Sequence, residues 1–272
     1  MPETLKDKVV LITGASSGFG ADAARLFASE EAQVILAARR MDRLETLAGE
    51  IRSRGGRAYP IQLDATDTSQ LAGAVDTLLE KFGRIDILFN NAGFGRLNWL
   101  EELDPQVDIQ AMIDINLTAL IQLTRLVLPH MYQRGSGHII NMASIAGYIP
   151  APLYTIYAAT KHGVRGFTNA LRREAKPCGI HVSGIYPGGA LTEFSRHTGE
   201  NPFKRNVKLP KCLYLSSETV ARRVVRLAKH PRRAVLMPWW YHPVALFDYL
   251  FPVAVDLFLS RWFVRRYHSP NS

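Results

Sequence analysis

Residues 13–20 read Thr13-Gly14-Ala15-Ser16-Ser17-Gly18-Phe19-Gly20; they end the apolar run Val9–Thr13 and precede an amphipathic stretch, Ala21–Ser29. Three glycines at this spacing let the chain turn tightly and bring its amides close to a pyrophosphate. The helix that follows presents its positive N-terminus to the same anion. A plain glycine-rich turn is the alternative, but the position after the first predicted strand favours a nucleotide site.

Outward from this turn, short hydrophobic runs alternate with longer amphipathic stretches. The predicted strands are Val9–Thr13, Gln33–Ala37, Ala58–Gln62, Ile85–Phe89, His138–Met142, His181–Tyr186 and Ala234–Met237. The predicted helices are Ala21–Ser29, Leu44–Arg54, Gln70–Phe82, Val107–Met131, Tyr157–Lys176 and Glu218–Lys229. This alternation predicts an α/β, single Rossmann-fold domain with a doubly wound parallel sheet of about seven strands. A length of 272 residues, of which 47% are apolar, fits one such domain.

The start of the chain and its cysteines bear on the compartment. Residues 1–8 are polar, and Val9–Thr13 is too short for a signal-peptide core, so we expect a cytoplasmic protein. Cys178 and Cys212 cannot build a disulfide framework. No His, Cys, Asp and Glu cluster has the spacing of metal ligands, so no catalytic metal is expected.

The end of the second predicted strand indicates the cofactor. An NAD site places an Asp or Glu there to bind the ribose 2′-hydroxyl. Here the sequence runs Ala37-Ala38-Arg39-Arg40, without the acid. Two guanidinium groups suit a 2′-phosphate, although solvated arginines at a helix start are the alternative. The absence of the acid favours NADP over NAD independently of the role of the two arginines.

Two further groups of residues follow predicted strands. Asp64 and its neighbour Ala65 follow the third strand, where the carboxylate is placed to accept from an adenine amino group. Asn90-Asn91-Ala92-Gly93 follows the fourth, and small residues there leave room for a flat cofactor. Ligands of open α/β sheets bind outside the carboxyl ends of the strands, so we expect both groups to line one crevice.

Tyr157 and Lys161 are four residues apart in Tyr157-Ala158-Ala159-Thr160-Lys161 and share one face of a helix. An ammonium beside a phenol is expected to lower the pKa of the tyrosine toward a useful acid–base range. Ser144, just beyond the fifth predicted strand, is a candidate for holding a substrate oxygen. Tyr148 and Tyr154 flank these residues and are predicted to form the wall of a substrate pocket.

Together these motifs closely resemble the short-chain dehydrogenase/reductase family over residues 6–238. The matching residues are Thr13–Gly20, Asp64, Asn90–Gly93, Asn116, Ser144, Tyr157, Lys161, Pro187, Gly188 and Thr192. The family members are NAD(P)-dependent oxidoreductases that move a hydride between the nicotinamide and a carbonyl or secondary-alcohol carbon.

The resemblance implies a role for each matching residue. Tyr157 is the implied general acid in reduction and base in oxidation, and Lys161 is expected to bind the nicotinamide ribose and tune Tyr157. Ser144 is expected to orient the substrate oxygen, while Asn116 kinks its helix and holds a water that relays protons to Lys161. Around the cofactor, the implied residues are Gly14, Ser16, Ser17, Gly18 and Phe19 at the pyrophosphate turn, and Tyr157, Lys161, Pro187, Gly188 and Thr192 beside the nicotinamide and its ribose.

The last quarter of the chain differs from the rest in charge. Residues 1–195 carry 19 Lys and Arg against 20 Asp and Glu, whereas residues 196–272 carry 14 against 4. A one-sided basic segment suggests an anionic partner. Nucleic acid is not expected, because no recognition motif accompanies the charge. The polar segment 193–215 is predicted to be a substrate-lid excursion from a catalytic domain of residues 1–238.

Residues 239–272 form a predicted C-terminal extension. Residues 243–259 read PVALFDYLFPVAVDLFL, which Pro252 divides into two short predicted helices. A spanning helix needs about 20 apolar residues, so an amphipathic helix lying in an anionic membrane interface fits better. Packing over the substrate pocket or against a second subunit is the alternative.

These observations predict an NADP(H)-dependent oxidoreductase acting on a lipophilic substrate such as a steroid, a retinoid or a long-chain keto-lipid. The family resemblance implies a homodimer or homotetramer in contact through the helices around 107–131 and 157–176. An NADP-binding scaffold or regulator on the same fold is the alternative. Such proteins tend to lose the catalytic tyrosine or lysine, and this chain keeps both.

Overall fold

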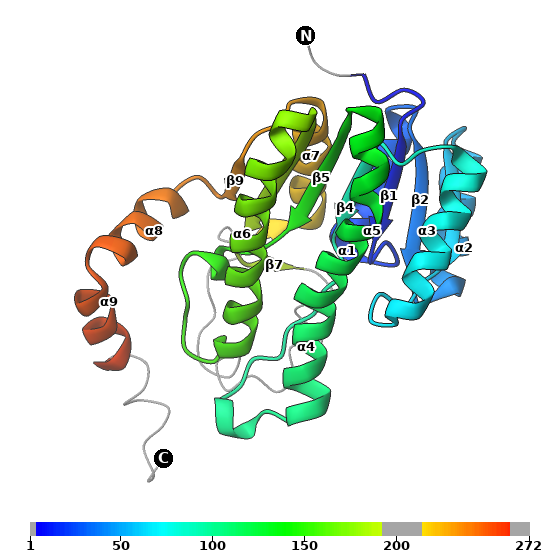
Figure 1. Ribbon diagram of the computed structural model, residues 1–272. Helices are drawn as coiled ribbons and strands as arrows, with labels where there is room; N and C mark the ends of the chain where they lie inside the picture. Colours follow the sequence, from blue (N-terminus) through cyan, green and yellow to red (C-terminus); the bar gives the residue numbers. More distant parts are fainter. Residues whose placement is uncertain (1–3, 192–213, 262–272) are drawn as a thin grey trace.

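The computed structural model describes residues 4–191 and 214–261, which form one α/β domain with a helical tail (Figure 1). Its main sheet has seven strands in the order β3-β2-β1-β4-β5-β6-β9, and every neighbouring pair is parallel. The order of the strands reverses between β1 and β4, because β2 and β3 lie on one side of β1 and the later strands lie on the other. Ligands of this fold bind at such a switch point. The predicted Rossmann-type architecture is confirmed.

The strands are β1 Val9–Thr13, β2 Gln33–Ala38, β3 Arg57–Gln62, β4 Ile87–Asn90, β5 Gly137–Met142, β6 Ile180–Pro187, β7 Ala190–Leu191, β8 Leu215–Ser216 and β9 Ala234–Met237. The α-helices are α1 Gly18–Ser29, α2 Met41–Ser53, α3 Thr68–Phe82, α4 Ala111–Ile113, α5 Ala119–Arg134, α6 Thr155–Ala175, α7 Ser217–Lys229, α8 Tyr241–Leu250 and α9 Pro252–Leu259. Short 3₁₀ or π turns are η1 Leu100–Glu102, η2 Pro105–Gln110, η3 Asp114–Thr118, η4 Ile145–Gly147 and η5 Lys176–Cys178.

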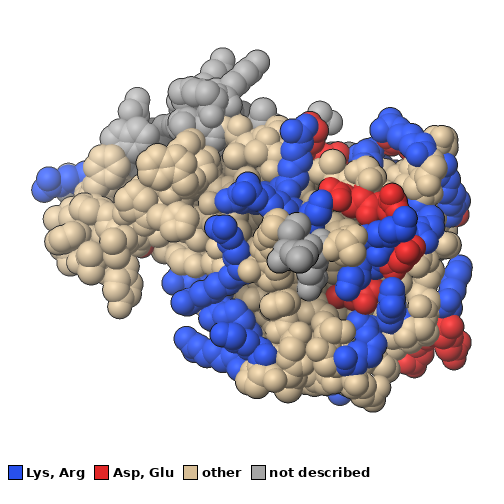
Figure 2. Space-filling model, turned by 90° about the horizontal axis from the view of Figure 1, so that it is seen from above, with Lys and Arg blue, Asp and Glu red and all other residues tan. Residues whose placement is uncertain are grey.

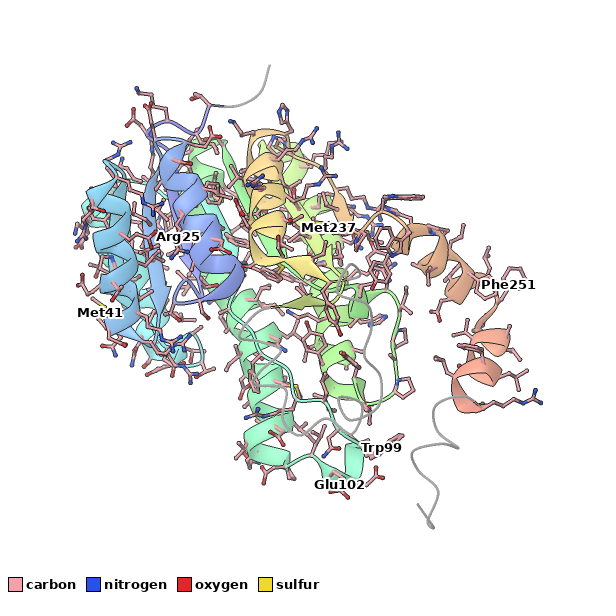
Figure 3. The ribbon with its side chains drawn as sticks, turned by 180° about the vertical axis from the view of Figure 1, so that it is seen from behind. Arg25, Met41, Trp99, Glu102, Met237 and Phe251 are labelled. Carbon is pink, nitrogen blue, oxygen red and sulfur yellow. The ribbon has the colours of Figure 1, made fainter. Side chains whose placement is uncertain are left out.

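Two hydrophobic cores lie on opposite faces of the sheet. Successive strand residues point to opposite faces, so Val10 and Ile12 pack with α1, α2 and α7, whereas Val9 and Leu11 pack with α3, α5 and α6. All five residues of β1 are buried, as expected for a strand covered on both sides. Figure 3 shows α1, α2 and α7 from the side opposite to Figure 1.

The predicted elements agree with the structure within a few residues, and two features were not predicted. The stretch predicted as one helix over Val107–Met131 is a helix over 105–134 that contains the π segments η2 and η3. The strands β7 and β8 pair with each other outside the main sheet. This pairing brings the two ends of the segment 192–213 together; that segment, with most of the predicted lid excursion, lies outside the described residues.

His138 on β5 is fully buried and bonded to the Ser183 hydroxyl on β6, with 2.8 Å between Nε2 and Oγ. Burial lowers its pKa to about 3, and the nearby His181 acts in the same direction. The unfolded chain binds a proton at this residue below pH 6.5, whereas the folded chain does not. The stability contributed by neutral His138 is therefore lost as the pH falls from 6.5 toward 3.

We expect this residue to make folding sensitive to mild acid. Between about pH 7 and pH 5 it lowers the free energy of unfolding by about 2 kcal/mol. The same change in pH should lower the free energy of unfolding of His138→Leu by about 2 kcal/mol less than that of the wild type, whatever the absolute stability of the variant. Denaturant unfolding at both pH values measures this. The exposed His230→Asn is the control; an unchanged pH dependence in His138→Leu contradicts the assignment.

The tail leaves β9 and extends away from the body of the protein (Figure 1). Neither α8 nor α9 contains a buried residue, and Trp239, Tyr249 and Phe258 are 74%, 81% and 65% exposed. The helices are bent by 102° at the break before Pro252, as the proline predicts, and the exposed Phe251 lies at the bend (Figure 3). Among the described residues of the tail, α8 and α9 therefore do not cover the protein beyond Tyr241 at the start of α8.

Among the described residues, two segments have the length and composition of a membrane span. One is the helix 105–134, which is partly buried in the core, and the other is α8 with α9 taken together. A helix of ten residues is only about 15 Å long, half of the hydrocarbon thickness, so neither α8 nor α9 spans a bilayer alone.

Candidate active site

The glycine turn between β1 and α1 forms the floor of the crevice. Gly14 has a φ of +65°, and a Cβ there would lie 2.9 Å from the Cα of Ala92, so this position requires glycine. Ser17, at the N-cap of α1, makes no side-chain hydrogen bond to the helix. The first amides of α1 therefore have no capping side chain and are suited to an anion. The Phe19 side chain packs against the core, away from this surface.

Thr13 and Asn91 hold the turn against the end of β4. The Thr13 hydroxyl accepts hydrogen bonds from the amides of Asn91 and Ala92 at 2.9 and 3.0 Å. The Asn91 amide group donates to the carbonyls of Thr13 and Gly14 at 3.0 and 3.2 Å. These roles of Thr13 and Asn91 are not evident from the sequence. The polar residues flanking a required glycine were the available signal, but only the pairing of β1 with β4 brings them together.

The two arginines after β2 differ in their surroundings. The Arg40 guanidinium donates to the Ser16 hydroxyl at 3.0 Å and to the Ser17 hydroxyl at 3.2 Å. It therefore lies directly beside the glycine turn. The Arg39 side chain is exposed at the adjacent position. The site thus presents a cation and two hydroxyls where a nucleotide ribose would lie.

The residues after β3 and β4 meet at the carboxyl edge, as predicted. Ala65, Asn90 and Ala92 line one small hollow together with Thr13. The Asp64 carboxylate accepts from the amide and the hydroxyl of Thr66, which fixes its orientation. The Asn90 side chain points into the core instead and donates to Thr124 and Asn141, both at 2.9 Å. Its amide group is thus engaged inside the protein, and only its backbone belongs to the rim.

Ser144, Tyr157 and Lys161 lie together at the ends of β5 and α6, and all three are buried. A hydrogen bond joins the Ser144 hydroxyl to the Tyr157 phenol. The Lys161 ammonium lies 5.6 Å from the centre of the Tyr157 ring and donates to the Met142 carbonyl at 3.1 Å. Ser144 directly follows β5, and α6 carries Tyr157 and Lys161 on adjacent turns, so strand and helix converge on one point.

The expected lowering of the Tyr157 pKa by Lys161 is wrong for this structure. Burial raises the pKa of Tyr157 above its ordinary value; the hydrogen bond from Ser144 opposes this effect, and the nearby Tyr154 adds to it. Burial also lowers the pKa of Lys161 to about 8. The removal of each group from water is the largest cause of its shift. Tyr157 is thus held as a protonated phenol, and Lys161 titrates near neutral pH.

Asn116 lies in the π segment η3 and is buried beside the lysine. Its side chain accepts from the Phe94 amide at 2.9 Å and donates to the Phe94 carbonyl at 2.8 Å. It also donates to the hydroxyl of Thr160, the residue before Lys161, at 3.3 Å. Asn116 therefore links the Gly93–Phe94 segment to the helix of Tyr157 and Lys161.

Aromatic and aliphatic side chains surround the phenol. Leu103, Met112 and Ala146 form a buried cluster with Tyr157, and Phe94 and Tyr154 pack against it. Tyr154 is close to Tyr214 and Tyr241, both of which raise its pKa after the larger effect of burial. The surroundings of Tyr157 are thus apolar and aromatic, and the role of Tyr154 as the wall of a substrate pocket stays a prediction.

Tyr241 links this wall to the root of the tail. A Cβ on Gly188 would collide with the Tyr241 ring, so the ring packs directly on the backbone after β6. Pro187 ends β6 and Gly188 follows it at the carboxyl edge, where both were predicted. Thr192 lies outside the described residues.

The arrangement suits acid–base chemistry on a neutral oxygen next to a dinucleotide. A phenol and a hydroxyl converge in an apolar setting, with a titratable ammonium behind them. The glycine turn, the uncapped start of α1 and Arg40 fit a phosphorylated nucleotide. Among the described residues, no three His, Cys, Asp or Glu side chains lie close enough together to hold a metal ion.

Comparisons with known proteins agree with this chemistry. The sequence model of the family described as short chain dehydrogenase matches residues 8–202. Ketoacyl reductase HetN of Nostoc sp. is 36% identical over 235 residues, covering 86% of this chain and 79% of its own length.

Two solved structures are similar along most of their length. A short-chain dehydrogenase from Sphingobium yanoikuyae in complex with NADPH superposes with a TM-score of 0.78 at 32% identity, covering 92% of this chain and 95% of its own. A 3-ketoacyl-(acyl-carrier-protein) reductase from Brucella melitensis complexed with NADH superposes with a TM-score of 0.76 at 30% identity, covering 86% and 97%.

Proposed function

The chain belongs to the short-chain dehydrogenase family, and on this premise we propose that it is an NADP(H)-dependent reductase of a lipophilic ketone, or the dehydrogenase of the matching secondary alcohol. The observation that carries the proposal is the convergence of Ser144, Tyr157 and Lys161 beside an apolar, aromatic wall. Steroids, retinoids and long-chain keto-lipids are the substrate classes that such a wall suits.

Each of the three residues has a distinct role in this proposal. Bound NADPH supplies the hydride to the carbonyl carbon. The Tyr157 hydroxyl donates its proton to the substrate oxygen, and the Ser144 hydroxyl orients that oxygen by a hydrogen bond. Lys161 binds the nicotinamide ribose and, with a pKa of about 8, supplies protons to Tyr157 between turnovers. Asn116 positions the segment beside Lys161 and holds the relaying water.

The cofactor would lie across the carboxyl edge of the sheet. The pyrophosphate would be held by Gly14, Gly18 and the backbone of Phe19. The adenine would contact Asp64 and Ala65. The nucleoside would contact Ala92 and Gly93, next to Asn90. Pro187, Gly188 and Thr192 would border the nicotinamide. We propose NADP over NAD because Arg39 and Arg40 follow β2 without an acid, and because Arg40 lies beside Ser16 and Ser17.

The test is a panel of carbonyl compounds with NADPH consumption as the readout. The panel covers steroids, retinoids, long-chain ketones, β-ketoacyl thioesters and sugars, and each is measured with NADH as well. We expect turnover of one or more lipophilic members and none of the sugars. If NADPH binds but no carbonyl is reduced, the protein is a nucleotide-binding scaffold instead.

We further propose that the protein is cytoplasmic and that the tail attaches it to an anionic membrane. The exposed apolar residues of α8 and α9 support this, since burial in the interface gains about 25 cal/mol per Å². Trp239, Trp240 and Tyr249 are suited to the headgroup layer, and Arg261 follows α9. The family resemblance also leads us to propose a homodimer or homotetramer in contact through α5 and α6.

Deletion of residues 243–272 tests the membrane proposal and keeps Tyr241 in place. We expect the full chain to float with phosphatidylserine-containing liposomes and the truncated chain to stay at the bottom of the gradient. The truncated chain should still fold and bind NADPH, because α8 and α9 contain no buried residue. If the full chain never floats and truncation splits an oligomer, the tail is a contact between subunits.

A further inference from the structure

Five arginines lie in a row of two groups around the edge of the sheet at β9, and the groups are joined by the chain neighbours Arg232 and Arg233. Arg172 comes from α6, Arg232 and Arg233 directly precede β9, and Arg223 and Arg226 come from α7. Arg233 is close enough to Arg172, and Arg226 and Arg232 to Arg223, for their charges to interact. The row, which we call the arginine belt, thus crosses from one helical layer over the open edge strand to the other.

The belt has little compensating charge among the described residues. Burial lowers the pKa of Arg172 and Arg223, and the neighbouring guanidinium groups lower it further. The nearby acids Glu218 and Glu30 already pair with Arg222 and Lys229. Repulsion within the belt opposes folding of the isolated chain, and an anionic partner would relieve it.

The belt and the tail lie on the same side of the protein. Figure 2 shows blue side chains with almost no red ones over the half of the molecule next to the protruding tail, while the other half carries both colours. The belt adjoins the start of β9, and Trp239 and Tyr241 follow its end. Four strand residues separate them, which is a distance of about 13 Å. One flat surface can therefore contact both.

A second copy of this chain fits the belt poorly. A two-fold contact through this edge would bring the same patch of each copy face to face and set arginine against arginine. A bilayer with anionic lipids provides both complements at once, phosphates for the belt and an apolar boundary for the tail.

We propose that the arginine belt is a second membrane-binding element, which recognises anionic phospholipid headgroups and sets the orientation in which the tail inserts. The proposal rests on the membrane association proposed above. In this orientation the edge strand β9 faces the bilayer. Tyr241, which packs on Gly188 beside the candidate substrate pocket, then lies at the lipid surface, where a lipophilic substrate enters.

The test uses the full chain with all five belt arginines changed to Gln. The matched control removes five positive charges from the opposite edge of the sheet, around α2, β3 and α3; its substitutions are Lys6→Gln, Arg52→Gln, Arg54→Gln, Arg57→Gln and Lys81→Gln. Flotation is measured at low and high salt. The vesicles are phosphatidylcholine alone, and phosphatidylcholine with phosphatidylserine in equal parts. Reduction of a soluble ketone with NADPH and the sedimentation profile check folding and assembly.

The wild type and the control should bind the phosphatidylserine vesicles more tightly than the neutral ones, with an excess that high salt removes. The belt variant should lose that excess, roughly a hundredfold in partition coefficient at low salt, while its binding to neutral vesicles and its turnover of the soluble ketone persist. If the belt variant binds as the wild type does, or if the control loses as much, the belt proposal is wrong while the tail proposal stands. If the variant changes only in sedimentation, the belt is a contact between copies. If the wild type binds neither vesicle, both membrane proposals fail.

Discussion

Tyr157→Phe is expected to lower kcat for carbonyl reduction by about 10²–10⁴-fold, the usual value of general acid catalysis. The variant loses only the hydroxyl that donates the proton, and the ring continues to fill the cluster with Leu103, Met112 and Ala146. NADPH affinity should stay within a few-fold of the wild type, because the phenol is expected to make little contact with the cofactor. Stopped-flow turnover and fluorescence titration of NADPH measure the two quantities separately.

Tyr132→Phe is the matched control for this result. Tyr132 is a partly buried tyrosine on α5 that packs against the core, away from Ser144 and Lys161. It should retain nearly full activity. A Tyr157→Phe variant with more than about a tenth of the wild-type kcat would remove Tyr157 from the role of proton donor.

The second large effect concerns the choice between the two nicotinamide cofactors. Wild-type protein should prefer NADPH over NADH by about ten- to a hundredfold in kcat/KM, since charge-assisted hydrogen bonds contribute about 1.5–3 kcal/mol each. The double variant Arg39→Ala, Arg40→Ala should lose most of that preference, because it binds NADPH more weakly. NADH should be used about as well as before, because it has no 2′-phosphate.

The single variants show which arginine acts. Arg40 lies beside Ser16 and Ser17, so Arg40→Ala should lose more of the preference for NADPH than Arg39→Ala does. Arg54→Ala is the control, because Arg54 is an exposed arginine at the C-terminal end of α2, whereas Arg40 lies at the N-terminal end of that helix. Equal use of both cofactors by the wild-type protein would overturn the 2′-phosphate proposal.

The strand–helix order and the crevice residues could be predicted because their signals are local in the chain. The runs that became β1 and β2 are continuous and apolar, and the glycine turn follows β1 at once. The family resemblance implies a kink at Asn116, but the residues there have the pattern of an ordinary helix, so the π segment and its bonds to Phe94 are known only from the structure. The pairing of β7 with β8 involves two residues on each strand, too few for a periodic signal.

The sequence by itself determined the fold class and the family, because short-range motifs and hydrophobic periodicity specify them, and it predicted the residues of the crevice. It also located the break in the tail at Pro252, since proline cannot donate the amide that a continuous helix needs. Only the tertiary structure decided the protonation of the site: burial, which no motif encodes, raises the pKa of Tyr157 against the expectation from Lys161. The tertiary structure also turned the Asn90 side chain inward, and it brought Arg233 close to Arg172 and Arg232 close to Arg223, because strand pairing and helix packing join residues that are far apart in the chain.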